Sequence, residues 1–314
     1  MKILQFIKPL CIILFLNVCF SMNGYAQTEP MYSQYMHNQL SINPAYAGNR
    51  ESLQLVLFQR RQWVGMEGAP QTSSASINQS IRDHKMGWGL QLYDDRIGVE
   101  KASGANFMLS TKVRVSNEGY LSGGLSAGLM NYSIGLTSVN ERFTPSDPAF
   151  YANLNKWMPN LGLGLFYNTD KFYAGVSIPN VIKSKLSTFD LIRSGLQKTN
   201  QYHVFITSGY VFELNEDVKI KPSAMLKMVS GAPTQIDLNT NVLLQNKLGL
   251  GLSYRTGDAI VSMVELQASE RIKIGYAYDL SITSYKYYNN GSHELMLSFE
   301  LSDEKAKVKS TRYF

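Results

Sequence analysis

The stretch ANFMLSTKVRVSNEGYLSGGLSAGLMN, residues 105–131, decides the fold. From Ala105 to Val115, Ala, Phe, Leu, Thr, Val and Val occupy every second position, and Asn, Met, Ser, Lys and Arg fill the positions between. Alternation with a period of two indicates a β-strand with one apolar and one polar face. Residues 116–119 are polar and end in glycine, and the alternation resumes over 120–131. The stretch therefore predicts an antiparallel hairpin with a tight turn.

The same alternation recurs along the whole chain and predicts about fourteen strands. We expect them at residues 53–63, 72–81, 86–94, 105–115, 120–131, 160–168, 172–178, 202–212, 218–229, 235–244, 248–254, 259–268, 272–280 and 293–301. Short connections follow the even-numbered strands, and the longest connections follow odd-numbered strands. This is the pattern of outer-membrane barrels, which have short periplasmic turns and longer extracellular loops. The expected fold is all-β, a transmembrane antiparallel up-and-down β-barrel over residues 51–301.

A soluble β-sandwich also has alternating strands, but its connections need not alternate between short and long. Aromatic residues favour the barrel, because they would form belts at the two membrane interfaces. The outward-facing aromatic residues are expected near the periplasmic interface at Tyr167, Phe172 and Phe299, and near the external interface at Phe205, Tyr254, Tyr276 and Tyr278. A closed barrel also leaves no open sheet edge in lipid.

The first residues predict export. Lys2 and Lys8 precede an apolar stretch, and Gly24-Tyr25-Ala26 is a small-x-small cleavage site, as in a secretory signal peptide. The expected organisation is a signal peptide at 1–26, an N-terminal periplasmic or plug-like segment at 27–50, the barrel at 51–301 and a C-terminal tail at 302–314.

Composition narrows the chemistry and the partners. The chain of 314 residues has a formal net charge of +6, but its basic residues are scattered, so nucleic acid is not an expected partner. Outer-membrane lipid and lipopolysaccharide are the expected anionic surroundings. Cys11 and Cys19 are the only cysteines, and both lie in the predicted signal peptide. The mature chain therefore has no residue for a disulfide, a zinc-thiolate site or a thiol nucleophile.

A search for catalytic and metal-binding residues predicts neither, and no cofactor is expected. The four histidines, His37, His84, His203 and His293, have no second ligand at metal-binding spacing. His203 and Ser208 share a predicted strand with opposite parity, so they point to opposite faces. The segment YDDRIG, residues 93–98, places two acids in an expected loop. A solvated turn explains these acids better than a calcium site does.

The sequence SQYMHNQLSINPAYAGNR, residues 33–50, closely resembles the N-terminal hallmark of the PorP/SprF family, outer-membrane proteins associated with the type IX secretion system of Bacteroidota. Further matching pieces follow in the expected order. They are YAGVSIPNVI (173–182), KPSAMLKMVSGAPTQIDLN (221–239), LGLGLSYRTGDAI (248–260), IKIGYAYD (272–279) and NNGSHELMLSFEL (289–301). One departure from the family pattern is the tail at 302–314, which extends beyond the last strand.

The resemblance implies a function that composition does not. It implies a non-enzymatic protein of the cell outer membrane that works with other type IX secretion components. The protein would help a particular large adhesin or gliding-type protein to be secreted or to stay attached to the surface. It would act through the C-terminal sorting domain of that secreted partner. The alternatives are a passive outer-membrane channel or hydrophobic-compound transporter and, less consistent with the aromatic belts, a soluble periplasmic binding protein.

Two groups of residues are candidate binding sites. The first is the N-terminal motif, represented by Asn43, Pro44, Tyr46 and Gly48, which is either an ordered periplasmic lead-in or a docking or plug element for a secretion partner.

The second group is basic. Given the expected strand directions, five inward-facing cations should gather at the periplasmic end of the lumen: Lys112, Arg114, Lys219, Lys221 and Lys273. Asp237, Asp279 and Glu294 should lie toward the outside. The basic end is either ordinary interior solvation or a receiving surface for an acidic element. That element would be the segment around Glu29 or the sorting domain of the secreted partner.

Overall fold

The computed structural model describes residues 31–50, 52–81, 85–137, 152–182, 202–229 and 232–301. The predicted signal peptide at 1–26 and the predicted tail at 302–314 lie outside these ranges, as do Glu29 and His84.

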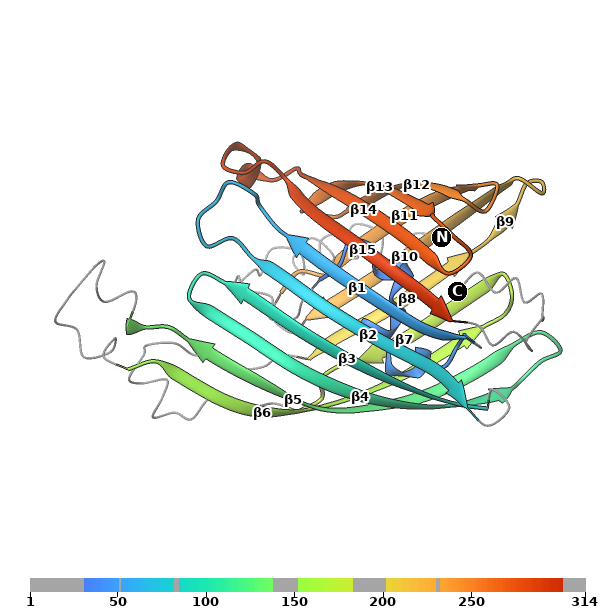
Figure 1. Ribbon diagram of the computed structural model, residues 1–314, viewed down its shortest axis with the longest axis horizontal. Helices are drawn as coiled ribbons and strands as arrows, with labels where there is room; N and C mark the ends of the chain where they lie inside the picture. The colour runs from blue at the N-terminus through green and yellow to red at the C-terminus, as the bar shows by residue number, and fades with distance from the viewer. Residues whose placement is uncertain are drawn as a thin grey trace, which may run out of the picture.

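The described strands form one closed antiparallel barrel (Figure 1). All belong to a single sheet, in which β15 pairs with β1 and β10 pairs with β11. The short segment β9 continues β8 along the same edge of β10, so the barrel has fourteen strands, as the sequence predicts. The segments are β1 (Leu53–Arg61), β2 (Gln71–Ile81), β3 (Met86–Ile97), β4 (Glu100–Arg114), β5 (Tyr120–Ile134), β6 (Leu154–Asn168), β7 (Phe172–Ile178), β8 (His203–Tyr210), β9 (Phe212–Glu213), β10 (Val218–Val229), β11 (Gln235–Leu244), β12 (Leu248–Arg255), β13 (Ala259–Gln267), β14 (Ile272–Ser281) and β15 (Ser292–Leu301).

The hairpin expected from residues 105–131 is formed by β4 and β5. The backbone N–H of Val115 donates to the carbonyl of Gly119 at 3.0 Å, and the N–H of Gly119 donates to Oγ of Ser116 at 2.8 Å. These bonds close the tight turn, because they satisfy the backbone groups that the strand ladder leaves free.

The two ends of the barrel differ in their connections. At the end where β1 begins and β15 ends, every connection between described strands is three to five residues long. We call this the turn end. The longest connections, at 135–153 and 179–202, lie at the opposite loop end, which also carries a short 3₁₀ helix, η5 (Ser284–Tyr287). Three loop-end connections are also short, namely 98–99, 230–234 and 256–258.

The loop expected at residues 93–98 was a wrong prediction. β3 continues to Ile97 and β4 begins at Glu100, so the two strands pair along residues 86–97. Asp94 is satisfied within this hairpin by Arg96 and Lys101, each at 3.0 Å. Side-chain ion pairs thus allow a strongly polar stretch to remain in a strand.

The strand faces divide as expected for a membrane barrel. Leu109, Leu125 and Leu163 lie opposite one another on three adjacent strands, and Leu125 is 67% exposed on the outer face. Inward-facing positions are rich in serine and asparagine. Phe205 was expected to face outward, but its side chain is buried inside, where it packs with Tyr35.

No helix among the described residues is long and apolar enough to cross a membrane.

Candidate functional site

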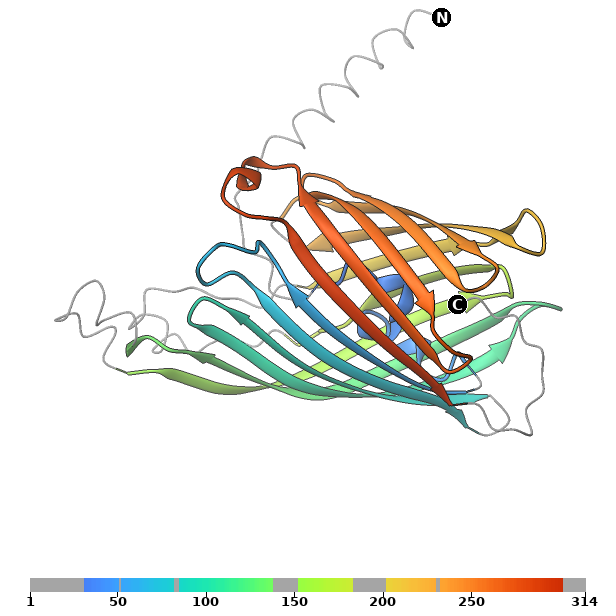
Figure 2. The same cartoon turned by 45° about the horizontal axis from the view of Figure 1, so that its top comes forward.

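Residues 31–50 lie inside the barrel, and we call this segment the plug. Figure 2 shows it, in blue, enclosed by the barrel wall. It folds into three 3₁₀ helices: η1 (Tyr35–His37), η2 (Gln39–Ser41) and η3 (Pro44–Tyr46). Fifteen of its twenty residues are buried. It touches wall strands on several sides: Tyr32 packs with β1 and β15, Tyr35 with β8 and β10, and Tyr46 with β4, β6 and β7.

The motif around Asn43 folds because its first residues provide the cap of a helical turn. Oδ1 of Asn43 accepts a hydrogen bond from the N–H of Ala45 at 2.9 Å, and Pro44 occupies the first helical position, where a missing N–H costs nothing. Nδ2 of Asn43 donates to the carbonyl of Leu165 in β6 at 3.0 Å. Asn43 therefore both forms the turn and fixes it to the wall.

Tyr46 and Gly48 attach the same turn through packing. The Tyr46 ring meets Phe166 edge to face, with ring centroids 5.4 Å apart. Gly48 has a φ of +64°, and a Cβ there would overlap the backbone of Gly87 in β3. Only glycine allows both the left-handed backbone and this close approach. The four motif residues therefore share one place, the contact between the plug and the barrel wall.

The plug runs from the loop end to the turn end. Ser33 lies against Asp279 and Glu294, which are near the loop ends of β14 and β15. At its other end, the carbonyl of Asn49 accepts from Nζ of Lys112 at 3.3 Å, and Arg50 pairs with Glu300 at 3.2 Å near the turn end of β15.

A buried group of charges, which we call the loop-end ion cluster, holds the first part of the plug. Its members are Arg60, Asp237, Arg255, Asp279 and Glu294, each at most 3% exposed. Arg60 bonds Asp279 at 2.8 Å and Glu294 at 3.1 Å. Arg255 bonds Asp237 at 3.1 Å and Asp279 at 3.3 Å. Two guanidinium groups are thus paired with three buried carboxylates, and Arg255 also pairs with the more exposed Asp258 at 3.3 Å.

The plug completes this cluster. The backbone N–H groups of Ser33 and Gln34 each donate to one oxygen of Glu294 at 2.8 Å. Oγ of Ser33 donates to Asp279 at 2.7 Å and accepts from Arg60 at 2.8 Å. A carboxylate removed from water needs several such donors, and the plug provides part of them to Glu294 and Asp279.

The structure places the acidic side of the cluster where the sequence predicts it, toward the loop end. Sequence reasoning missed Arg60 and Arg255. A signal was present, because both arginines occupy inward-facing positions near the loop ends of β1 and β12.

The predicted basic residues separate into two groups. Lys221 and Lys273 line one cavity at the turn end, and Lys219 donates to Asn246 at 2.8 Å on the rim of that cavity. Lys112 contacts the plug at Asn49. Arg114 has the same parity as Lys112 but lies at the end of β4, where its side chain is exposed and its guanidinium donates to the carbonyls of Ser116 and Asn117. Arg114 stabilises the turn because it lies at the end of its strand.

His37 of the plug lies 3.0 Å from Glu265 of β13. Burial lowers the pKa of His37, and the neighbouring carboxylate of Glu265 offsets part of this effect. No group of three or more His, Cys, Asp or Glu residues within the described ranges could hold a metal ion.

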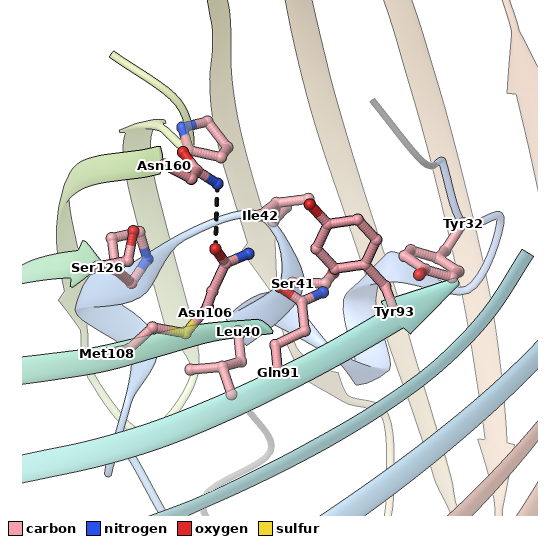
Figure 3. A pocket seen from close by; sticks show the side chains of 12 residues that line it. Tyr32, Leu40, Ser41, Ile42, Gln91, Tyr93, Asn106, Met108, Ser126 and Asn160 are labelled. Carbon is pink, nitrogen blue, oxygen red and sulfur yellow. Dashed lines mark hydrogen bonds between the residues drawn. The ribbon is translucent and has the colours of Figure 1, made fainter. Parts of the chain in front are cut away.

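The space between the plug and strands β3 to β6 is small. Figure 3 shows a pocket between the plug residues Tyr32, Leu40 and Ile42 and the strands β3 to β6, where Asn160 donates to Asn106 at 3.1 Å. Its volume is about 30 Å³, which accommodates only a few water molecules. The plug therefore fills this part of the lumen.

Comparison with known proteins gives a family match. Residues 24–299 match the family model described as type IX secretion system membrane protein PorP/SprF. No curated protein sequence gives a significant match.

Solved structures share the barrel fold at low sequence identity. The CymD monoaromatic hydrocarbon channel is 12% identical, with a TM-score of 0.50, over 90% of this chain and 96% of that chain. The Acinetobacter baumannii outer membrane protein Omp33 is 10% identical, with a TM-score of 0.48, over 80% of this chain and 99% of that chain. At such identity, likeness concerns the fold alone.

Proposed function

Because the chain belongs to the PorP/SprF family of type IX secretion system membrane proteins, we propose that it assists the export of a specific partner. The protein is a non-enzymatic outer-membrane barrel. It helps a large adhesin or gliding-type protein to be secreted or to stay attached to the cell surface, and it acts through the partner's C-terminal sorting domain.

The observation that carries this proposal is the plug inside the barrel. A passive channel needs a continuous polar path, but Ser33, Asn43 and Asn49 are each bonded to the wall at a different depth of the lumen. A barrel that is closed at rest fits a protein that handles a partner better than one that conducts solutes.

The turn end is the side on which we place the partner. In outer-membrane barrels short turns face the periplasm, so a secreted chain would meet this end first. The basic residues Lys112, Lys219, Lys221 and Lys273 lie here, and so does the last part of the N-terminal motif. Clustered positive charge raises the encounter rate of an acidic partner and favours one orientation of it.

The alternative function is a passive channel or hydrophobic-compound transporter. The likeness to a monoaromatic hydrocarbon channel favours it, although this likeness is one of fold. The two functions differ in what happens when the protein is lost.

The test is deletion of the chromosomal copy, followed by quantitative mass spectrometry of proteins shaved from intact cells. We expect one or a few large proteins with C-terminal sorting domains to leave the surface, while other cargo of the same secretion system stays. Restoring the chain should restore the display. Unchanged display of every such protein would contradict the proposal.

A further inference from the structure

A second cavity lies at the turn end of the lumen, with a volume of about 120 Å³. Four of its described lining residues are cations, namely Arg50, Lys221, Lys247 and Lys273. Glu265 is the carboxylate among them. The other lining residues include the amides of Asn246 and Gln267. The cavity is therefore a basic space with polar walls.

The described carboxylates at this cavity lie beside basic groups, and Oε2 of Glu265 is buried with no hydrogen-bond partner among the described residues. Glu265 is 3.0 Å from His37 and 3.7 Å from Lys273. Glu300, which borders Arg50, bonds both Arg50 and Ser52. Among the described residues, two carboxylates thus lie near four cations, and Lys219 lies beside them, where it donates to Asn246.

Arg50 supplies a further observation. Its Nη1 bonds Glu300 at 3.2 Å, whereas its Nε is buried and has no hydrogen-bond partner among the described residues. A buried donor without a partner costs free energy, and so does the confinement of several like charges. An oxyanion in the cavity would reduce both costs.

We propose that this cavity binds a carboxylate of an acidic polypeptide segment that enters from the turn end. The size of the cavity admits one or two side chains and excludes a folded domain. Lys221, Glu265 and Lys273 belong to the inward-facing sets of β10, β13 and β14, so the ligand comes from the lumen and not from the lipid surface. The identification of the segment with a secreted partner rests on the proposed function.

The site also involves the plug. Arg50 is the last plug residue, and Nε2 of His37 in the plug lies 3.0 Å from Oε2 of Glu265 at the cavity wall. A carboxylate that enters competes with Glu300 for Arg50 and with Glu265 for Lys273. Occupation of the cavity therefore weakens the Arg50–Glu300 contact, which holds the end of the plug at the turn end.

The experiment uses the full chain, folded in detergent, and a fluorescently labelled glutamate-rich peptide as the probe. We expect the peptide to bind more tightly than its glutamine counterpart, and the binding to weaken as salt is raised. The double variant Lys221→Gln/Lys273→Gln should weaken it by about tenfold or more, since two charge-assisted contacts are lost. Heat-modifiable migration on gels confirms that the variant is folded.

A matched control and a milder variant complete the design. Lys171→Gln removes the same charge at the turn end, where Lys171 pairs with Glu213 and is 48% exposed, and it should leave binding unchanged. The milder variant is Lys247→Gln. Lys247 lines the cavity from the turn between β11 and β12, so this variant should lower the affinity for the peptide without altering an inward-facing strand position. Equal affinity of the chain for the two peptides would overturn the proposal. So would an affinity of the double variant for the glutamate-rich peptide equal to that of the unmodified chain. Preference for inorganic phosphate over the peptide would overturn the polypeptide assignment. If peptide binding fails but surface display still depends on the barrel, the inference fails and the proposed function stands.

Discussion

Nη2 of Arg60 and Oδ2 of Asp279 lie 2.8 Å apart, with both side chains 3% exposed. The two residues belong to β1 and β14, which are separated in the barrel by β15. Ser33 of the plug bonds both of them. This ion pair therefore connects two strands, across the intervening β15, with the plug at the loop end of the lumen.

The first prediction concerns this pair. Arg60→Met leaves the carboxylates of Asp279 and Glu294 without their nearest cation, and the loss of one partner of a buried pair costs about 3–5 kcal/mol. We expect this loss in the free energy of unfolding, measured by urea titration of heat-modifiable migration. Lys101→Met breaks the exposed pair with Asp94 and should cost about 0–1 kcal/mol. Similar losses for the two variants would contradict the account of the cluster.

The second prediction uses two adjacent glycines of β5. A Cβ on Gly124 would overlap the backbone of Ala45 in the plug, whereas a Cβ on Gly123 has Leu165 Cδ2 as its nearest neighbour, at 3.8 Å on the outer face. Gly124→Val should therefore unseat the plug and lower the stability of the barrel by about 1–3 kcal/mol. Gly123→Val should be neutral or stabilising. The same urea titration measures both, and equal stability of the two variants would place the plug elsewhere.

The third prediction concerns the lipid-facing surface. Leu125 is 67% exposed in the middle of β5, and Leu121 is 37% exposed near the turn end of the same strand. Arginine costs about 2–4 kcal/mol at the midplane of the bilayer and about 0–1 kcal/mol near its interfaces. Refolding into lipid vesicles should show Leu125→Arg to be the more destabilised variant. A reversed order would refute the assigned depth of β5.

The fourth prediction concerns orientation. Tyr287 is 77% exposed at the loop end, and Asn117 lies in the β4–β5 turn. If the short turns face the periplasm, a membrane-impermeant thiol reagent should label Tyr287→Cys on intact cells. It should label Asn117→Cys only after the outer membrane is permeabilised. Cys11 and Cys19 lie in the predicted signal peptide and leave the rest of the chain free of thiols. Labelling of Asn117→Cys on intact cells would invert the topology.

The alternation of residues was sufficient to predict the barrel, because each strand has one face in lipid and one face inside. The prediction failed at residues 93–98, where a run of charged residues was interpreted as a loop. Asp94 and Asp95 stay in β3 because Lys101 of β4 and Thr72 of β2 bond them from the neighbouring strands, contacts that the sequence of one strand does not reveal.

The interior was harder to predict than the wall. Phe205 was placed in lipid because aromatic residues form belts there, but inside this barrel the plug provides an apolar partner. The plug itself has no helical or strand periodicity, since its conformation depends on contacts with the wall such as Asn43 with Leu165. The acids of the loop-end ion cluster were located from strand direction, but Arg60 meets Asp279 and Glu294 only because β1 pairs with β15 to close the barrel.

The most direct test of the central claim, that the barrel is closed by its own N-terminal segment and does not serve as a passive channel, is the conductance of the purified full chain in planar lipid bilayers. The account predicts that the full chain stays closed, because the plug is bonded to the wall from Ser33 to Asn49. A variant that lacks residues 31–48 should form a steady open pore. A steady open pore formed by the full chain itself would contradict the account and favour the channel.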